Sequence, residues 1–277
     1  MRKMFVYSLF GKHFGFWNAI PYILLLNSEV YPDFEMKFLV EESCQDMDSF
    51  KLLKKVSERF NSIHIEIINE TSIGLKLTIW RMKPLWDDDI DYLFCRDMDY
   101  TINVLAKKSV EYFLSQSECI IHAMRSYKLH STPLMAGMCG FKVKPVRDKI
   151  KSLANTFGDY VDFGRKQVEY CKDWRWGCDQ ALLRDFFRGA GMYQFILDCP
   201  QYDAPVQLDK VDSNYCPVSK YSSIDLPNCN MEVLKLSDSF IIPKFFTGKT
   251  FFHTPIQLEA VLKLCKSGIS KFVRGLL

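Results

Sequence analysis

The stretch Asp89-Ile90-Asp91-Tyr92-Leu93-Phe94-Cys95-Arg96-Asp97-Met98-Asp99-Tyr100 decides both the fold class and the expected position of the site. Its middle part, Tyr92–Cys95, is a short apolar run of the kind that fills a buried strand, and charged residues end it abruptly at Arg96. In open α/β sheets, ligands bind outside the carboxyl ends of the strands. The stretch therefore predicts a strand whose carboxyl end carries two carboxylates, Asp97 and Asp99, into a binding site.

The two aspartates are spaced to share one divalent cation. In extended backbone, residues i and i+2 project to the same side. Mg²⁺ and Mn²⁺ prefer hard oxygen ligands and are often held by one or two carboxylates, with phosphates and water completing the shell. An Asp-x-Asp spacing is also common among solvated loop residues, so context has to support a metal site at Asp97 and Asp99.

The chain before this stretch alternates strands with helices. Strands are predicted at Met4–Phe10, Met36–Val40 and Ile63–Ile68, and helices at Phe14–Ser28 and Met47–Phe60. This β-α-β-α-β order predicts an α/β fold with a Rossmann-type, mainly parallel central sheet flanked by helices. Gly11, directly after the first strand, would let the backbone approach a ligand closely.

The chain after this stretch continues with less regular alternation. Residues 198–249 are rich in Pro, Asn, Asp and Ser and predict loops. Helical pieces are expected at Val104–Leu114, Asp148–Phe157, Lys166–Trp174, Ala181–Phe187 and Pro255–Leu277, and strands at Cys119–Met124 and Tyr193–Leu197.

Composition narrows the class of protein. A chain of 277 residues with 48% hydrophobic residues can bury a sizeable core, and a net charge of +3 is too small to indicate nucleic-acid binding. Its ten cysteines include no Cys-x-x-Cys pair, which favours reduced, buried thiols and a cytoplasmic location. The longest apolar run, Ala19–Leu26, is too short to span a bilayer.

Several segments, taken in order, resemble one family. After the strand that ends at Gly11 and the βα units come Trp80-Arg81, the Arg96-Asp97-Met98-Asp99 strand end and His122-Ala123-Met124-Arg125, and then Thr132–Met138 and Gly177-Cys178-Asp179-Gln180. This order resembles GT-A-type glycosyltransferases, more narrowly single-domain bacterial and viral sugar transferases with an Arg-Asp-x-Asp motif. The resemblance covers roughly residues 4–200.

The resemblance implies one GT-A-like domain over residues 1–277. Residues 1–100 would form its nucleotide-binding half, 101–200 its donor-sugar and acceptor half, and 201–277 loops and a C-terminal helix. Asp97 and Asp99 would hold Mn²⁺ or Mg²⁺ on the diphosphate of a nucleotide-sugar, and His253 would complete the metal shell. The residues expected to bind the nucleotide and the donor sugar are Leu9, Phe10, Gly11, Arg81, Arg96, Asp97, Met98, His122, Ala136 and Gly137.

The Asp179-Gln180 pair resembles the pair that related transferases place near the reacting carbon of the sugar, which implies a catalytic role. A carboxylate there could orient sugar hydroxyls or remove the acceptor's proton, although Asp179 at a helix start could also be only a cap. The pair favours retention of configuration, with inversion open. Where the family has an aspartate after the strand-end arginine, this chain has Ser126, which leaves donor and acceptor choice open.

The expected partners follow from the same resemblance. The donor would be a UDP-sugar, with a GDP-sugar second, and the acceptor a glycan or a protein-linked or lipid-linked group. Lysines beside the apolar stripe of the C-terminal helix would allow peripheral membrane contact, or that helix packs on the protein. Asp97-Met98-Asp99-Tyr100-Thr101 also fits the motif of haloacid-dehalogenase-like phosphohydrolases, in which Asp97 is a nucleophile. A binding domain without turnover is the third alternative.

Overall fold

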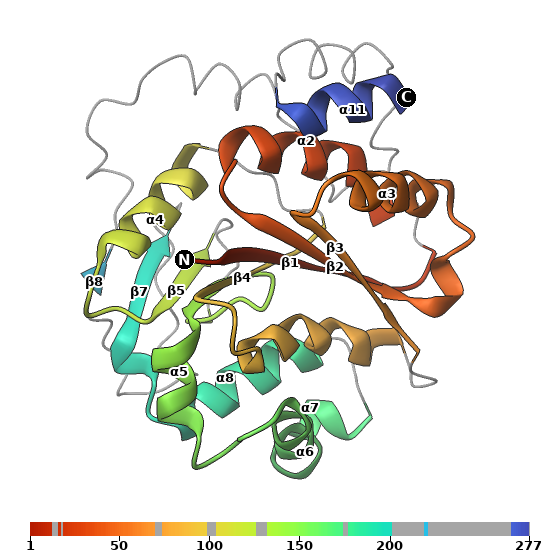
Figure 1. Cartoon of the computed structure of the whole chain (residues 1–277). Helices are drawn as coiled ribbons and strands as arrows, with labels where there is room; N and C mark the ends of the chain where they lie inside the picture. The colour runs from red at the N-terminus through yellow and green to blue at the C-terminus, as the bar shows by residue number, and fades with distance from the viewer. Residues whose placement is uncertain are drawn as a thin grey trace. The chain divides into compact units, whose positions relative to one another are not determined.

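A computed structural model of the chain describes residues 1–12, 16–17, 19–69, 74–98, 104–125, 132–173, 177–200, 219–220 and 267–276. It has a mixed α/β fold with a mainly parallel central sheet flanked by helices (Figure 1). The fold class predicted from the alternation of strands and helices is therefore confirmed. Asp99, His253 and nearly all of the 198–249 stretch beyond residue 200 lie outside the described residues.

The chain divides into two compact units. Unit 1 comprises Met1–Met4, Ser72–Arg96 and Lys108–Pro227, and unit 2 comprises Phe5–Thr71, Asp97–Lys107 and Asn228–Leu277. Each unit contains some of the strands and has helices of its own, and the two are described separately below. The expectation of a single domain over the whole chain stays a prediction.

Unit 2 contains the N-terminal βα units. Its strands follow the order β3-β2-β1, and β2 pairs with β3 in parallel, with Met36 opposite Ile63. The predicted strands and the helix at 47–60 are confirmed to within a residue or two, because each is a local pattern of buried side chains. The elements are β1 (Lys3–Leu9), α2 (Ile20–Val30), β2 (Glu35–Glu41), η1 (Glu42–Cys44), α3 (Asp48–Arg59), β3 (Ile63–Ile68) and α11 (Gly268–Leu276).

Helix α2 is the buried helix of unit 2. Nine of its eleven residues, Ile20 to Ser28, are buried, as expected for a helix that is apolar on nearly all sides. Helix α11 lies along it (Figure 1), where Ser267 Oγ is 2.9 Å from Ser28 Oγ and Val273 is fully buried. The C-terminal helix thus packs on protein along this face. Within the described ranges, every helix falls short of the length and apolarity that crossing a bilayer requires.

Unit 1 contains the other strands, in the order β4-β6-β5-β7-β8. Strand β6 runs antiparallel to both β4 and β5, whereas β5, β7 and β8 are parallel to one another. The sequence did not predict β6, because its Met-Cys-Gly-Phe-Lys stretch contains a glycine and only a short apolar run. The bounds are β4 (Tyr92–Arg96), β5 (Ile121–Arg125), β6 (Met138–Lys142), β7 (Ile196–Pro200) and β8 (Ser219–Lys220).

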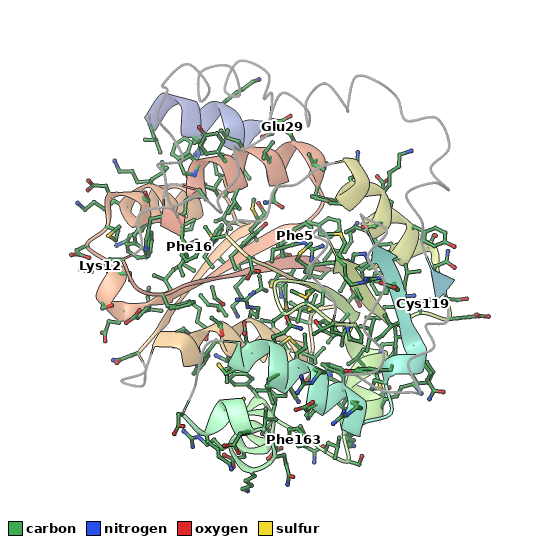
Figure 2. The ribbon with its side chains drawn as sticks, turned by 180° about the vertical axis from the view of Figure 1, so that it is seen from behind. Phe5, Lys12, Phe16, Glu29, Cys119 and Phe163 are labelled. Carbon is green, nitrogen blue, oxygen red and sulfur yellow. The ribbon has the colours of Figure 1, made fainter. Side chains whose placement is uncertain are left out.

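The helices of unit 1 correct two predictions. The short helix η3 occupies the first three residues of the strand expected at Tyr193–Leu197, so that strand begins only at Ile196. The helix expected at Asp148–Phe157 is wrong: α5 ends at Ile150, a turn follows, and a capping box between Thr156 and Asp159 starts α6. Phe163 of α6, labelled in Figure 2, packs edge-on against Phe186 of α8, with ring centroids 5.2 Å apart. The bounds are η2 (Gly74–Trp86), α4 (Val104–Ser115, divided between the units), α5 (Val143–Ile150), α6 (Phe157–Gln167), α7 (Glu169–Lys172), α8 (Cys178–Gly189) and η3 (Tyr193–Phe195).

Candidate functional site

The turn after β1 is held by hydrogen bonds to its backbone. Gly11 has a φ of 63°, in the left-handed region that favours glycine. Its N–H donates to Glu41 Oε2 at 2.6 Å, and its carbonyl oxygen accepts from Trp17 Nε1 at 2.9 Å and from Cys44 Sγ at 3.3 Å. The side chain of Leu9 is 1% exposed, so it belongs to the core of unit 2. The strand end expected to line a nucleotide is therefore a fixed turn.

Glu41 is a residue of this turn that the sequence reasoning missed. It is the last residue of β2, and its carboxylate binds the backbone N–H of Gly11. The signal was present, because a carboxylate directly after the predicted strand Met36–Val40 repeats the arrangement by which Asp97 was selected. Two strand ends of this chain thus carry a carboxylate, at Glu41 and at Asp97.

The end of β4 divides the predicted residues into different roles. Arg96 is buried, and its Nη1 donates to the carbonyl oxygens of Cys95 at 2.8 Å and Cys139 at 3.1 Å, which ties β4 to β6. Asp97 is half-buried and Met98 is buried. Among the residues that the structure describes, no group of three or more His, Cys, Asp or Glu side chains is placed to hold a metal. The metal assignment to Asp97, Asp99 and His253 stays a prediction.

Within unit 1, two predicted residues from distant segments meet. Arg81 of η2 is buried, and its Nε donates to the carbonyl oxygen of Thr78 at 2.8 Å. Its Nη2 lies 3.7 Å from Asp179 Oδ2, and the side chains are 6% and 20% exposed. Arg81 is therefore not a surface arginine. Arg81 places a positive charge beside the carboxylate of Asp179.

Asp179 lies in the first turn of α8, after Gly177 in the left-handed conformation. Its Oδ1 accepts from the backbone N–H of Gln180 at 2.9 Å, so the carboxylate satisfies one amide of the helix start. Burial, followed by the charge of Asp179, raises the pKa of the adjacent Cys178 thiol to about 11. Cys178 therefore stays protonated near neutral pH and is a neutral neighbour of Asp179.

Gln180 binds the segment that contains Ala136, one of the residues expected to bind the nucleotide and the donor sugar. Its Oε1 accepts from the N–H of Ala136 at 2.9 Å, and its Nε2 donates to Thr132 Oγ1 at 3.0 Å and to the carbonyl oxygen of Leu134. Ala136 is 7% exposed and Gly137 is buried. All polar groups of the amide thus point to residues 132–136, which fixes the shape of that segment.

Two buried thiols contact the backbone of Arg81 and of Ala136. Cys95 and Cys139 are opposite each other in the β4–β6 register, and both are fully buried. The Cys95 thiol lies 3.5 Å from the carbonyl oxygen of Arg81, and the Cys139 thiol lies 3.6 Å from that of Ala136. Burial raises the pKa of Cys139 well above its ordinary value, so this thiol is neutral packing material. The seven described cysteines are free and buried.

His122 lies in the core rather than at an accessible surface. Its side chain is 0% exposed and packs between the rings of Phe94, at 5.9 Å, and Phe113, at 5.3 Å. Among the described residues, neither ring nitrogen has a hydrogen-bond partner. Burial lowers the pKa of His122 well below 6.5, and the charge of Arg96 adds to that shift. The neutral imidazole therefore acts here as a core side chain.

A buried ion pair beside His122 was not predicted. Arg125, at the end of β5, donates through Nε and Nη2 to both carboxylate oxygens of Asp198 on β7, at 3.1 and 2.9 Å. Both side chains are nearly inaccessible, at 2% and 3% exposed. Arg125 was noticed in the sequence as a strand-end arginine, but nothing local identifies its partner 73 residues later. The pair ties the carboxyl ends of the two strands together.

The arrangement in unit 1 presents one carboxylate beside a fixed cation and a fixed loop. Asp179 is accessible in part, Arg81 is held by its own helix, and Gln180 fixes the loop of residues 132–136. Such a carboxylate can accept hydrogen bonds from hydroxyl groups or take up a proton. The Arg81 guanidinium, at 3.7 Å, places a positive charge beside this carboxylate.

No protein-family model matches the chain, and no curated protein matches it. Among solved structures, TarS of S. aureus matches with 12% identity and a TM-score of 0.38, over 60% of this chain and 55% of that one. A mannosyltransferase from Pyrobaculum calidifontis, in complex with GDP-Man and Mn²⁺, matches with 9% identity and a TM-score of 0.35, over 59% and 52%.

A glycosyltransferase involved in glycosylation of the major capsid of PBCV-1 matches with 12% identity and a TM-score of 0.35, over 61% of this chain and 69% of that one. This chain spans about half the length of the first two structures.

Proposed function

We propose that this protein is a glycosyltransferase that moves a sugar from a nucleoside-diphosphate sugar to a glycan or another acceptor. The observation that carries the proposal is the meeting of separate motif segments within unit 1. Arg81, the 132–136 segment and the Asp179-Gln180 pair lie far apart in the sequence and belong to the segments that resemble one family, and they contact one another through α8. Motifs that are distant in sequence and adjacent in space are expected of one site.

Asp97 and Asp99 are proposed to hold Mn²⁺ or Mg²⁺. The half-buried carboxylate of Asp97 follows β4 directly and is an oxygen ligand of the kind that these ions prefer. When bound, the metal would neutralise charge on the leaving diphosphate. In the same proposal, the turn of Leu9, Phe10 and Gly11 lines the nucleotide through its backbone.

Asp179 is proposed as the carboxylate that orients the sugar or takes the acceptor's proton. It is the one carboxylate of this turn that is both accessible and paired with a cation. For Gln180 we propose a narrower role than catalysis, because its amide is already used by the backbone of residues 132–136. Gln180 is then a positioning residue that keeps Ala136 and Gly137 against the donor sugar.

The remaining parts of the proposal rest on the resemblance seen in the sequence. The donor is a UDP-sugar, with a GDP-sugar second, and retention of configuration is favoured over inversion. The acceptor is a glycan or a protein-linked or lipid-linked group, and the protein acts in the cytoplasm as one domain. Contact with a membrane would use the exposed side of α11, where Lys271 is exposed.

The test begins with a thermal-shift screen of nucleoside diphosphates and nucleotide-sugars, with and without Mn²⁺, since a ligand of the native state raises the melting temperature. Stabilisation by one nucleotide only with metal supports the proposal, and turnover is then measured by release of the nucleoside diphosphate. Asp97→Asn is expected to lose the metal-dependent shift. Asp179→Asn should keep the shift and lose turnover, whereas Asp162→Asn, an exposed carboxylate of α6, should change neither.

Other outcomes identify the alternatives. Release of phosphate from a generic ester, lost in Asp97→Asn, would replace the proposal with a phosphohydrolase that uses Asp97 as its nucleophile. Nucleotide binding without any turnover would identify a binding domain. An Asp179→Asn variant that loses donor affinity and turnover equally would demote Asp179 to a binding residue.

A further inference from the structure

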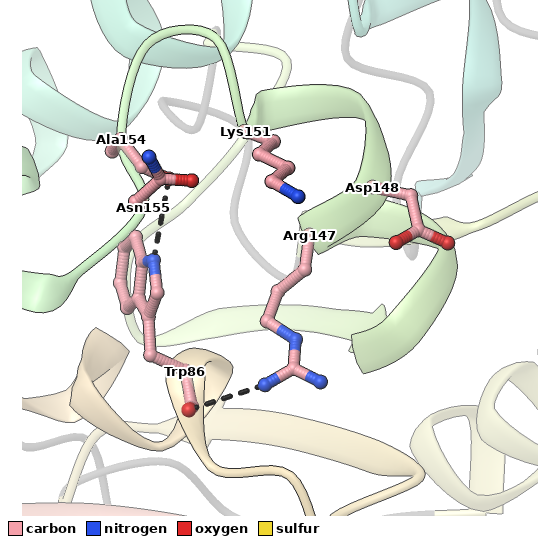
Figure 3. A pocket seen from close by; sticks show the side chains of 6 residues that line it. All are labelled: Trp86, Arg147, Asp148, Lys151, Ala154 and Asn155. Atoms are coloured by element: carbon pink, nitrogen blue, oxygen red, sulfur yellow. Dashed lines mark hydrogen bonds between the residues drawn. The ribbon is translucent and has the colours of Figure 1, made fainter.

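A hollow in unit 1 shares no residue with the proposed donor site. It has a volume of about 210 Å³ and is lined by Trp86, Arg147, Asp148, Lys151, Ala154 and Asn155. Figure 3 shows Trp86 and Asn155 on one side and Arg147 and Lys151 facing them from the other. The lining comes from the end of η2, the end of α5 and the loop before α6.

The walls of this hollow are held in place by their own contacts. Trp86 packs against Phe157 and Tyr160, with ring centroids 6.0 and 5.6 Å away, and its Nε1 donates to the carbonyl oxygen of Ala154 at 3.4 Å. Arg147 Nη1 donates to the carbonyl oxygen of Trp86 at 3.2 Å. Because these groups are already fixed, a ligand would lose little free energy in ordering them.

The hollow contains two cations, of which Arg147 is already paired and Lys151, within the described ranges, is not. Arg147 Nη2 lies 2.7 Å from Asp88, whose side chain is 95% exposed. Asp148 is 3.9 Å from Lys144 at the surface, which is a weak pair. Lys151 has no ion-pair partner among the described residues. The backbone N–H of Asn155 donates to Asp159 Oδ2 at 3.0 Å, whereas its side-chain amide shows no hydrogen bond in the same part of the chain. An anionic group would therefore find Lys151 and the guanidinium edge of Arg147 ready to bind it.

The rest of the lining, Trp86 with Asn155 and Asp148, indicates which uncharged groups a ligand of this hollow would carry. The indole N–H of Trp86 is used by Ala154, and the lining of the hollow is mostly polar, so the half-buried indole contributes only a small apolar surface. The partly negative face of an aromatic ring suits the C–H groups of a saturated ring, while Asn155 and Asp148 can bind hydroxyl groups. At about 210 Å³ the hollow is smaller than the ~300–1,000 Å³ pockets of drug-sized ligands, and it fits one monosaccharide-sized ring.

We propose that this hollow binds one sugar unit that carries a negatively charged oxygen group, either a carboxylate or a phosphate. The sugar ring lies on Trp86, its hydroxyl groups face Asn155 and Asp148, and its anionic group faces Lys151 and Arg147. The site shares no residue with the proposed donor site, and its binding can be measured without turnover. Success or failure here is therefore distinguishable from success or failure of the glycosyltransferase proposal.

The test is calorimetric titration of the full chain with four probes: methyl glucuronide, glucose 6-phosphate, methyl glucoside and inorganic phosphate. At least one charged sugar is expected to bind up to about fivefold more tightly than the neutral glucoside, since one accessible ion pair is worth up to ~1 kcal/mol. Which charged sugar binds distinguishes the carboxylate from the phosphate source. Tighter binding of glucose 6-phosphate than of inorganic phosphate shows that the ring contributes.

Variants assign the binding to this hollow. Lys151→Met should weaken the charged sugar about fivefold and leave the glucoside unchanged, and Asn155→Ala should weaken both. Both residues are exposed, so neither change should affect folding. Lys166→Met, an exposed lysine of α6 outside the hollow, is the matched control. Three outcomes would overturn the proposal: neither charged sugar binds more tightly than the glucoside, the affinity for the charged sugar is unchanged in Lys151→Met, or no heat is seen at about 10 mM, where a site with a Kd of ~1 mM is filled.

Discussion

Replacing Gln180 with leucine separates the positioning of the 132–136 segment from chemistry. Leucine is similar in size to glutamine and removes the acceptor for the Ala136 N–H and the donor for Thr132 and Leu134. Each hydrogen bond is worth about 1 kcal/mol net, and the nearly buried Ala136 amide would be left without its acceptor. We expect a loss of about 2–3 kcal/mol in the free energy of unfolding, or roughly 5–10 °C in melting temperature.

The assay has a local and a global readout. Hydrogen exchange at the Ala136 amide reports directly on the bond that Gln180 Oε1 accepts, and exchange there should accelerate in the variant. The melting temperature reports the global cost. Gln167→Leu is the matched control, because Gln167 is an exposed glutamine in the last turn of α6. It should leave both quantities unchanged.

Turnover of the nucleotide-sugar should fall in Gln180→Leu together with Ala136 protection, because the loop would lose its fixed shape. Unchanged protection and a melting temperature within about 1 °C of wild type would refute the reasoning. If turnover were lost under those same conditions, the amide would act in the reaction itself, as the sequence resemblance implied.

Three further predictions concern the buried groups of unit 1. Burial lowers the pKa of His122, so as the pH falls the unfolded state takes up a proton at this residue before the folded state does. The free energy of unfolding should therefore fall below pH 6.5, by up to ~1.4 kcal/mol per pH unit. Urea denaturation at several pH values should show a weaker pH dependence in His122→Phe. Gly140→Ala places a Cβ 2.5 Å from a ring carbon of Phe94 and should lower the free energy of unfolding by about 1–3 kcal/mol. Gly158→Ala, whose Cβ makes only an ordinary contact at 3.5 Å, should leave the melting temperature unchanged or raise it. Asp198→Asn leaves Arg125 buried beside an uncharged partner and should cost about 3–5 kcal/mol, more than replacing both residues with methionine; equal costs would contradict this.

The strands of the N-terminal half could be predicted because their signal is local. Ile63–Ile68 is observed with the predicted bounds, and β1, β2 and β4 differ by a residue or two, since each is a short apolar run ended by a turn or charge. Strand β6 could not be predicted, because antiparallel pairing with β4 is decided by residues more than forty positions away. Its Gly140 is required by the Phe94 ring opposite it, a constraint that no local pattern contains.

The wrong helix at 148–157 had a signal that was overlooked. Thr156 followed three residues later by Asp159 is the spacing of a capping box, and both of its hydrogen bonds are present. A helix starting there requires the preceding helix to have ended, which it does at Ile150. The intervening turn supplies Ala154 and Asn155 to the lining of the hollow beside Trp86. The hollow was missed in the sequence for the same reason that the turn was missed.

The adjacent residues Asp179 and Gln180 show what the sequence could and could not provide about the site. As a pair they were identified by their resemblance to a motif, which assigns both to the same chemistry. On a helix, however, consecutive side chains point about 100° apart, so neighbours in sequence face different surroundings. Here Asp179 faces Arg81 while Gln180 binds residues 132–136. Substitutions should therefore separate by readout, with stability and loop protection responding at Gln180 and turnover without loss of stability responding at Asp179.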